Sequence, residues 1–496
     1  MAIWKQPTTY VLCGLLCVGA FLRFDRISKE NLWVDEYWAL YLATGRGNTI
    51  FDIPLNTVIR SAPAANFADA PHWWHIWNGL ATTPHPPLYH LMLRGWVDLF
   101  GDGDRATRAM SAMFGLAGIL LIFDLGRALH GKLAGIFAAG IMTFAPAQID
   151  FSQQVRPYTM LAFIGLILWR SLILIEQKGP SRIRLLVLAL GVAGAALTHY
   201  FSLGVIAAAA CYAGFRFRGE KRKSVLLAIV ASLLLAAMIW SPFAWKTHYQ
   251  YIVGPDFGKM GVALTAAVID APRKLVFGTM DNPVAKTVMG WALAVIVYFS
   301  PAFRIRRDPR LLPAWLWTVG GIGFVLAIDL IGDTQFVDLP KYIFVSSPAI
   351  YLILAAPWGN GVGRLLPPAL LLATILYGVD RWQAGPQFSE STAVLARLIE
   401  QKVGADDAVI ITGQFDSEPA FRYFIISHYA GDWRHPVVLL TQPLDGKTGL
   451  ELATFHRVWV VGRDSSEMER FLPGWRITDY HGIAPGFSFW AIQPAK

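Results

Sequence analysis

Residues 86–100 read PPLYHLMLRGWVDLF, and this stretch decides how the chain is arranged in a membrane. It is apolar, but it is shorter than the ~20 apolar residues that a spanning helix needs, and it contains His90, Arg94 and Asp98. We therefore expect an amphipathic helix that lies on the membrane surface. If the stretch crossed the membrane instead, every loop after it would change sides.

The composition is that of an integral membrane protein. Of the 496 residues, 55% are hydrophobic and 16% are charged, whereas soluble domains usually carry about 25% charged residues. The net charge of +9 does not predict nucleic-acid binding, because the basic residues form short clusters between apolar runs. Cys13, Cys17 and Cys211 all lie inside apolar runs, so they predict neither a disulfide framework nor a metal site.

Apolar runs of sufficient length predict about eleven transmembrane helices. They cover residues 8–24, 106–129, 133–147, 158–175, 185–200, 203–215, 225–245, 287–303, 311–331, 342–358 and 365–379. No small-residue cleavage site follows the first run, so we expect an uncleaved helix there.

The basic residues assign the sides of the membrane. If the spans alternate strictly, one side receives Lys5, Arg127 with Lys132, residues 176–184, residues 216–223, residues 304–310 and Arg364. Short loops rich in lysine and arginine favour the cytoplasm, so this side is cytoplasmic. The outer side then receives residues 25–105, 150–157, 246–286 and 333–341 and the C-terminal tail.

A soluble domain is expected from about residue 381 to 496, because charged and polar residues become frequent and no run of span length remains. Helical patterns at 391–403 and 421–429 alternate with strand patterns at 407–413, 435–441 and 456–462. This order predicts a small α/β fold outside the cytoplasm, with a parallel sheet as one option. The domain has no nucleotide-binding motif, so we expect it to dock or select an acceptor. Residues 1–380 form the predicted membrane domain, including the first outer loop at 25–105.

Two adjacent carboxylates follow the first span. Asp35 and Glu36 stand between Trp33, Tyr37 and Trp38 at the outer membrane surface, a setting that suits a general base. The alternative is that Asp35 caps a short interfacial helix, which its aromatic residues anchor.

Polar and basic residues recur at the outer ends of later spans. One very short loop contains Asp150, Arg156 and Tyr158. An arginine so close to the hydrocarbon region binds an anionic ligand, forms a salt bridge with a residue such as Asp150, or extends its side chain to the membrane surface. His199 ends one span, and Lys341 with Tyr342 begins another. Each is ordinary as a helix anchor, but together they would form a patch able to hold a lipid-linked phosphate. His85, before two prolines, is typical of a turn.

The motifs WVDE (33–36), HPPLYHLMLRGW (85–96), FGDGDRATRAMSAMFGLAGILLIFDLGRALHG (100–131) and FSQQVRPYTM (151–160) occur in an order that is specific. This ordered set resembles bacterial glycosyltransferase family 39, the protein O-mannosyltransferase-like members of the GT-C superfamily. The resemblance covers about residues 20–200 well and the later spans only in topology.

The resemblance implies an inverting transfer of a sugar from a polyprenyl-phosphate donor to an acceptor on the outer face of the bacterial inner membrane. Asp35 would be the general base, with Glu36 supporting the acceptor or the loop. Donor-phosphate binding would fall to Arg156, Tyr158, His199, Lys341 and Tyr342, and His85 would shape the site.

The chain departs from the family pattern at two places. Relatives commonly read Ser-Gln-Glu-Ala-Arg-Pro-Tyr, whereas Gln154 and Val155 stand at the glutamate and alanine positions here. Either Asp150 replaces the missing acid or Asp35 acts without a second one. Lys341 also replaces an arginine, so a bidentate fork becomes a point charge.

The sequence leaves several alternatives open. No metal site is predicted, although a divalent cation bridging Asp35, Glu36 or Asp150 to the donor phosphate stays an option. A transporter or flippase of lipid-linked sugars, or a membrane scaffold without catalysis, is the rival function. The sugar is not specified, and neither is the acceptor, which is lipopolysaccharide, protein or another envelope polysaccharide.

Overall fold

A computed structural model describes residues 7–47, 49–63, 66–80, 83, 85–247, 263–359, 361–385, 392–413, 417–431, 433–462, 465–483 and 487–494. The chain divides into two compact units. The first, here called the helical unit, consists of Met1–Ile27, Pro84–Trp96 and Arg105–Gly385, and the second, the α/β unit, consists of Ser28–Thr83, Val97–Asp104 and Pro386–Lys496.

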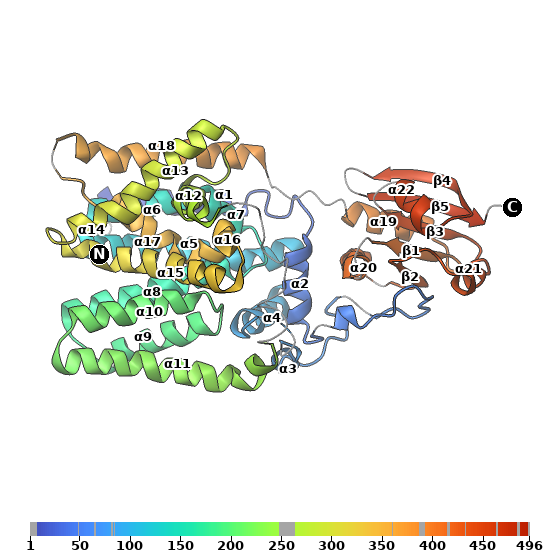
Figure 1. Cartoon of the computed structure of the whole chain (residues 1–496), viewed down its shortest axis with the longest axis horizontal. Coiled ribbons are helices and arrows are strands. Elements are labelled where there is room, and N and C mark those ends of the chain that lie inside the picture. Colours follow the sequence, from blue (N-terminus) through green and yellow to red (C-terminus); the bar gives the residue numbers. More distant parts are fainter. Residues whose placement is uncertain are drawn as a thin grey trace. The chain divides into compact units, whose positions relative to one another are not determined.

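Long helices that run side by side make up most of the helical unit (Figure 1). The α-helices are α1 (Pro7–Phe24), α5 (Asp104–His130), α6 (Lys132–Phe144), α7 (Pro146–Ser152), α8 (Tyr158–Lys178), α9 (Arg182–Ala196), α10 (Ser202–Arg216), α11 (Gly219–Thr247), α12 (Leu264–Phe277), α13 (Pro283–Ala294), α14 (Ser300–Arg304), α15 (Leu312–Gly332), α16 (Pro340–Ile343), α17 (Ser347–Ala355) and α18 (Leu366–Ala384). Short helical turns are η4 (Val295–Phe299), η5 (Pro309–Leu311), η6 (Phe336–Asp338), η7 (Phe344–Ser346) and η8 (Gly361–Leu365). Helix α4 (Leu88–Phe100) has residues in both units.

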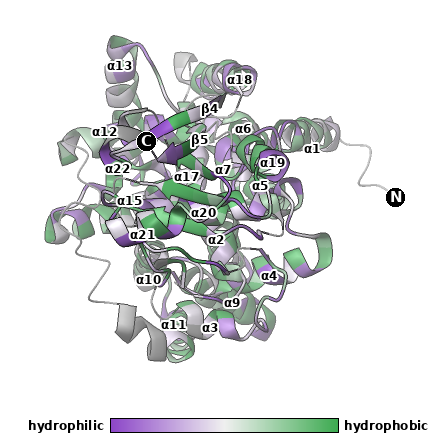
Figure 2. Cartoon of the chain, turned by 90° about the vertical axis from the view of Figure 1, so that its right-hand side faces the viewer, coloured by the Kyte–Doolittle hydropathy of each residue, from purple (hydrophilic) through white to green (hydrophobic). Residues whose placement is uncertain are grey.

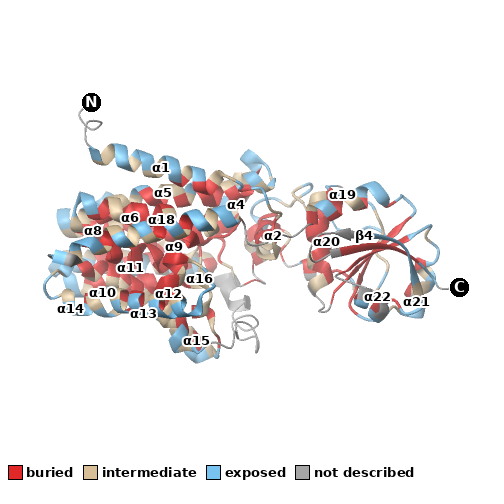
Figure 3. Cartoon of the chain, turned by 90° about the horizontal axis from the view of Figure 1, so that it is seen from above, coloured by how far each residue is buried: buried red, intermediate tan, exposed pale blue. Residues whose placement is uncertain are grey.

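Several helices have the length and hydropathy of membrane spans. Within the described residues there are 6, or up to 7 if α6 and α7, which meet at a 58° bend, form one broken span. Each of the predicted runs falls on a helix or a helix group, but the total of about eleven spans stays a prediction. Large apolar side chains face outward along α1, as Tyr10 and Phe21 do, and Figure 3 shows this helix as largely exposed. Such a surface is stable against lipid.

Most of the stretch 86–100, predicted as an amphipathic helix, forms α4, a helix of 13 residues. It is not among the candidate spans of the described chain. The expectation of a loop at 246–286 is wrong in part, because the chain forms α12 at Leu264–Phe277. Charged residues and the internal Pro272 interrupt its apolar pattern, although Ala267, Ala271 and Leu275 form a buried face.

Small residues and one buried arginine shape the packing of the helices. A Cβ atom on Gly204 of α10 would collide with the carbonyl oxygen of Gly320 of α15, so these glycines allow close contact. Where α6 bends into α7, Pro146 interrupts the helix and frees carbonyl groups. The buried Arg23 of α1 donates to the carbonyl oxygens of Met142 (2.9 Å) and Thr143 (3.3 Å) and so satisfies the end of α6.

The α/β unit contains a five-stranded sheet of order β2-β1-β3-β5-β4. Its strands are β1 (Ala408–Thr412), β2 (Val437–Leu440), β3 (Val458–Gly462), β4 (Trp475–Ile483) and β5 (Phe487–Pro494). Its helical elements are α2 (Val34–Ala43), η2 (Thr49–Phe51), α3 (His75–Gly79), α19 (Thr392–Lys402), α20 (Ser417–Ala430), α21 (Gly446–Leu452) and α22 (Ser465–Phe471).

The predicted strands and helices of the C-terminal part are confirmed at β1, β2, β3, α19 and α20. Strand β1 pairs in parallel with both β2 and β3, whereas β5 is antiparallel to β3 and β4, so a fully parallel sheet is wrong. The three parallel strands are hydrophobic and buried along their length, as Figures 2 and 3 show.

Part of the segment between α1 and α4 extends this sheet. Ile59 forms an antiparallel bridge with Val437, with both backbone hydrogen bonds at 2.9 Å. Val58 packs against the apolar cluster that includes Val438 and Trp490. The boundary predicted near residue 380 stays a prediction, and the contacts add that residues 28–83 and 97–104 group with the C-terminal part.

Candidate functional site

Arg156 is held in the turn between α7 and α8. Its side chain is buried, with 6% exposed, and Nη2 donates a 3.0 Å hydrogen bond to the hydroxyl of Tyr158. The guanidinium carbon lies 5.4 Å from the centre of the Tyr158 ring. The Ser111 hydroxyl donates to the Arg156 carbonyl oxygen at 3.2 Å. Backbone and side chain are therefore both fixed.

His199 lies between α9 and α10, next to Arg156. The amide of Phe201 donates to Nδ1 of His199 at 3.2 Å, so in the neutral ring the proton is on Nε2. Burial, together with the charges of Arg156 and Lys341, lowers the pKa of His199 to about 3. At neutral pH the ring is therefore an uncharged donor beside two cations.

His85 belongs to the same cluster. Burial lowers its pKa well below the usual value, and the charges of Arg156, His90, His199 and Lys341 act in the same direction. Charges influence a buried ring mainly over short distances, and the His85 ring centre lies 5.8 Å from that of His90. The structure thus brings together His85, Arg156, His199 and Lys341, which the sequence placed in separate loops.

Aromatic rings surround Lys341 and Tyr342 at the start of α16. The Tyr342 ring centre is 5.0 Å from that of Phe201, 4.9 Å from that of Phe336 and 6.3 Å from that of His199. The Lys341 Nζ atom lies 5.2 Å from the centre of the Tyr342 ring. Tyr158 completes the ring contacts, at 6.2 Å from His199.

Two sets of polar contacts fix the segment that precedes Lys341. The buried Asp329 carboxylate accepts hydrogen bonds from the Phe336 and Val337 amides, both at 2.8 Å, and from the Thr334 hydroxyl at 2.6 Å. On the other side, Lys274 of α12 pairs with the Asp338 carboxylate and donates to the Asp338 carbonyl oxygen at 2.8 Å. Lys341 is therefore presented by a braced turn.

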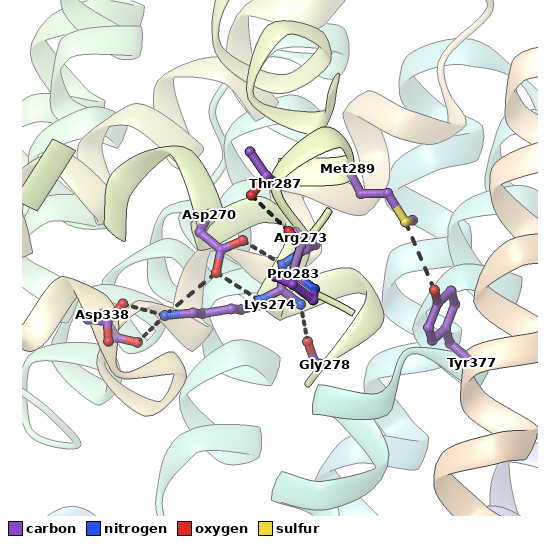
Figure 4. Close-up of polar contacts among 9 residues, drawn as sticks. All are labelled: Asp270, Arg273, Lys274, Gly278, Pro283, Thr287, Met289, Asp338 and Tyr377. Atoms are coloured by element: carbon purple, nitrogen blue, oxygen red, sulfur yellow. Dashed lines mark hydrogen bonds and ion pairs between the residues drawn. The ribbon is translucent and has the colours of Figure 1, made fainter. Parts of the chain in front are cut away.

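Figure 4 shows the network around Lys274. Arg273 binds the Asp270 carboxylate through two nitrogens, at 2.5 and 2.7 Å, and also donates to the Gly278 carbonyl oxygen at 2.5 Å. The four side chains Asp270, Arg273, Lys274 and Asp338 carry a formal net charge of zero. This network was not among the predicted site residues, although its acid and bases stand at i, i+3 and i+4 on one helix, a spacing visible in the sequence.

Asp150 does not pair with Arg156. Its carboxylate forms an ion pair with Arg381 of α18, with Oδ1 at 2.7 Å from Nε. The salt bridge to Arg156 that the sequence offered as an alternative is therefore wrong. Gln153 is structural as well, because its amide nitrogen donates to the carbonyl oxygens of Leu22 (3.0 Å) and Asp25 (3.1 Å).

Asp35 and Glu36 lie in the first turn of α2, in the α/β unit. Glu36 is buried, and its carboxylate accepts a hydrogen bond from the Trp33 amide at 3.3 Å. Glu36 therefore stabilises the start of the helix, the part that the sequence offered to Asp35 as its alternative role. Asp35 is half-buried at the second position of the helix.

Within the described residues no group of three or more histidine, cysteine, aspartate or glutamate side chains could hold a metal ion. The bridging divalent cation stays a prediction. The roles of the individual site residues likewise stay predictions.

Comparison with known proteins identifies the type of fold. A family model described as dolichyl-phosphate-mannose-protein mannosyltransferase matches residues 84–245. No curated protein shows significant similarity to the chain.

Two kinds of solved structure match the chain over most of its length. ArnT from Cupriavidus metallidurans, bound to undecaprenyl phosphate, matches with a TM-score of 0.57 and 14% identity over 98% of each chain. The oligosaccharyltransferase of Archaeoglobus fulgidus matches with a TM-score of 0.51 and 13% identity over 94% of this chain and 70% of its own. At these identities the likeness concerns the fold.

Proposed function

We propose that this chain is a GT-C glycosyltransferase that transfers a sugar from a polyprenyl-phosphate donor to an envelope acceptor, a proposal that its fold and the family model over residues 84–245 support. The observation that carries the proposal is a chain of contacts in the helical unit, from Arg156 to Tyr158, His199, Tyr342 and Lys341. The imidazoles of His199 and His85 stay uncharged beside these cations. The bound undecaprenyl phosphate of the ArnT structure supports a donor of this chemistry.

The cationic cluster suits a lipid-linked phosphate. Arg156 offers a fixed guanidinium, Lys341 offers a second charge, and Nε2 of His199 offers an uncharged donor. Charge-assisted hydrogen bonds of this type are stronger than neutral ones, and more so in a poorly solvated site. Tyr158 and Tyr342 line the cluster with aromatic faces and hydroxyl groups.

The proposed reaction is a direct displacement. The Asp35 carboxylate takes the proton of an acceptor hydroxyl while that oxygen bonds to the anomeric carbon of the donor. The bond between the anomeric carbon and the phosphate oxygen breaks, and its electron pair stays on the lipid phosphate. Arg156 and Lys341 stabilise the charge that develops there, and each such contact in a preorganised site lowers the barrier by about 3 kcal/mol. Attack opposite the leaving group inverts the anomeric centre.

We place this reaction on the outer face of the bacterial inner membrane, because the basic loops assign the motif-bearing loops to that side. Lipopolysaccharide, protein and another envelope polysaccharide are the acceptor classes. We place the C-terminal part on the same, extracytoplasmic side of the membrane.

Mass spectrometry of envelope glycans and glycolipids tests the proposal. Cells with the wild-type protein are compared with cells that lack it and with cells that carry Asp35→Asn. We expect one sugar-modified species in the wild type only. Asp52→Asn is the matched control, because it makes the same change at an exposed aspartate of the same unit.

Two outcomes would reject the enzyme. If Asp35→Asn at normal membrane levels keeps the modified species, Asp35 is not the base. If the species is present in every strain while lipid-linked sugar changes sides of the membrane, the protein is a transporter.

A further inference from the structure

Helix α2, which carries Asp35, packs against helix α20 of the C-terminal part within the α/β unit. The contact is aromatic, and it buries Tyr37 and Tyr41 almost completely. Its ring pairs are Tyr41 with Phe424 (4.9 Å between centres), Tyr37 with His428 (5.7 Å) and Trp38 with Phe421 (6.3 Å). Because apolar packing is non-directional, such a contact determines which face of α2 is buried. The position of α2 along its own axis must be set by hydrogen bonds.

Tyr429 of α20 supplies those bonds. Its hydroxyl accepts a 2.7 Å hydrogen bond from the amide of Leu32, and it donates a 2.8 Å hydrogen bond to the carboxylate of Asp104. Leu32 is fully buried and directly precedes Trp33, the first residue of the cap of α2. A buried amide needs an acceptor, so the hydroxyl fixes the backbone three residues before Asp35.

Further bonds attach the rest of the outer loop to the same part of the chain. Asn56 adopts a φ of 57°, and its side-chain oxygen accepts from the Thr441 amide at 2.9 Å. The Asn56 carbonyl oxygen accepts from the Thr448 hydroxyl at 3.0 Å. The hydroxyl of Tyr423, on α20, donates to the Pro63 carbonyl oxygen at 2.9 Å.

We propose that the C-terminal part positions the catalytic carboxylate, with Tyr429 as the positioning residue, through the bonds of its hydroxyl to Leu32 and Asp104. The inference rests on the proposed role of Asp35. It gives the C-terminal part a task in the reaction besides docking an acceptor. Tyr429 does not act on the substrate itself.

The consequence for the reaction is geometric. Without the hydroxyl, the start of α2 loses its bond to α20 while the aromatic contact remains. A displacement of about 1 Å can cost on the order of 100-fold in rate. The cationic cluster is assembled from residues of the helical unit, so donor binding is expected to be unaffected.

Tyr429→Phe in the full-length protein tests the inference, because it removes the hydroxyl and keeps the ring. We expect the sugar-modified species in cells to fall about 10-fold or more, while the Kd for undecaprenyl phosphate changes less than about 2-fold and membrane levels stay normal. Hydrogen exchange in the peptide that contains Leu32 is expected to be about 10-fold faster.

Two further variants separate positioning from general damage. Asp104→Asn keeps an oxygen that accepts from Tyr429, so near-normal sugar transfer is expected. Asp104→Ala removes this acceptor, so its transfer is expected to fall toward the level of Tyr429→Phe. Tyr480→Phe removes a hydroxyl from an exposed tyrosine of the same unit and is expected to change nothing.

Each outcome is decisive. Wild-type levels of sugar transfer in Tyr429→Phe overturn the inference. A rise in the Kd for undecaprenyl phosphate by the same factor as the loss of transfer also overturns it. If wild-type cells make no modified species, the proposed function fails, and the exchange of the Leu32 peptide still tests the positioning: an unchanged rate in Tyr429→Phe overturns it.

Discussion

The two units of the chain hold their charged groups in different ways. In the helical unit, Arg156 is buried and Lys341 is half-buried beside aromatic rings, and a neutral ion network on α12 and η6 braces the turn that presents the lysine. In the α/β unit, Asp35 is half-buried in the first turn of a short helix. The start of this helix is held by two backbone amides, which donate to the Glu36 carboxylate and to the Tyr429 hydroxyl.

The difference teaches how the proposed work is divided. Cations that receive a phosphate gain from a rigid, poorly solvated setting, because they need not reorganise when charge develops. A general base must meet an acceptor hydroxyl and release a proton, which suits a partly exposed carboxylate. The comparison predicts that binding and transfer can be separated by mutation.

Asp35→Asn is expected to have the largest effect. It removes the proposed base, whose contribution to the rate is typically about 10²–10⁴-fold. Transfer measured with membrane fractions that contain lipid-linked sugars should fall by that factor. Glu36→Gln still accepts the Trp33 amide, so it should keep most of the activity. Equal losses in both variants would mean that the start of α2 has only a structural role.

Arg156→Met is expected next, because it removes one cation and the bond to Tyr158. Hydrogen bonds to charged groups contribute ~1.5–3 kcal/mol, so undecaprenyl phosphate should bind about 10- to 100-fold more weakly. Arg156→Lys keeps the positive charge but loses the bidentate guanidinium, so its Kd should lie between those of the wild type and Arg156→Met. Binding measured by displacement of a fluorescent lipid phosphate checks this order. A wild-type Kd in Arg156→Met would remove the arginine from the site.

The buried imidazoles predict how stability depends on pH. The pKa of His199 is about 3 in the folded chain and about 6.5 when unfolded, so the unfolded state binds more protons between these values. Stability should therefore fall as pH drops below about 6.5, by up to about 1.4 kcal/mol per pH unit for this group. Melting temperatures from pH 7.5 to 4.5 measure the slope, which His199→Gln should flatten.

The brace behind Lys341 is expected to give the smallest effect. Asp338→Asn and Lys274→Met each loosen the turn without touching the phosphate, so undecaprenyl phosphate should bind about 5-fold more weakly in each, the weight of one hydrogen bond near 1 kcal/mol. The double variant should resemble either single one, because the two residues act as a pair. Additive losses would show that they act independently.

The sequence predicted the helical part of the fold well, since long apolar runs leave few alternatives to helices in a membrane. It also predicted the strands β1, β2 and β3, whose residues are continuously apolar. Helix α12 was missed because its charged residues are satisfied inside the protein and hide the period. Strand β4 is the exposed edge of the sheet and carries a mixed pattern, which sequence periodicity cannot separate from loop.

The residues of the candidate site were largely predictable as types and places. An arginine, a lysine and histidines at helix ends were visible in the sequence, and in the structure the charges of Arg156 and Lys341 act on both His85 and His199. Their support was not predictable. Asp329 closes a local turn that has no regular period, whereas Lys274 and Asp338 join segments far apart in the sequence, and the partner of Asp150 proved to be Arg381.

The most direct test of the division of labour is a titration of undecaprenyl phosphate against purified wild-type protein, Asp35→Asn and Arg156→Met in parallel. The account predicts a Kd for Asp35→Asn within about 2-fold of wild type and a Kd for Arg156→Met at least about 10-fold higher. Equal affinities in all three proteins, or a loss in Asp35→Asn alone, would contradict it.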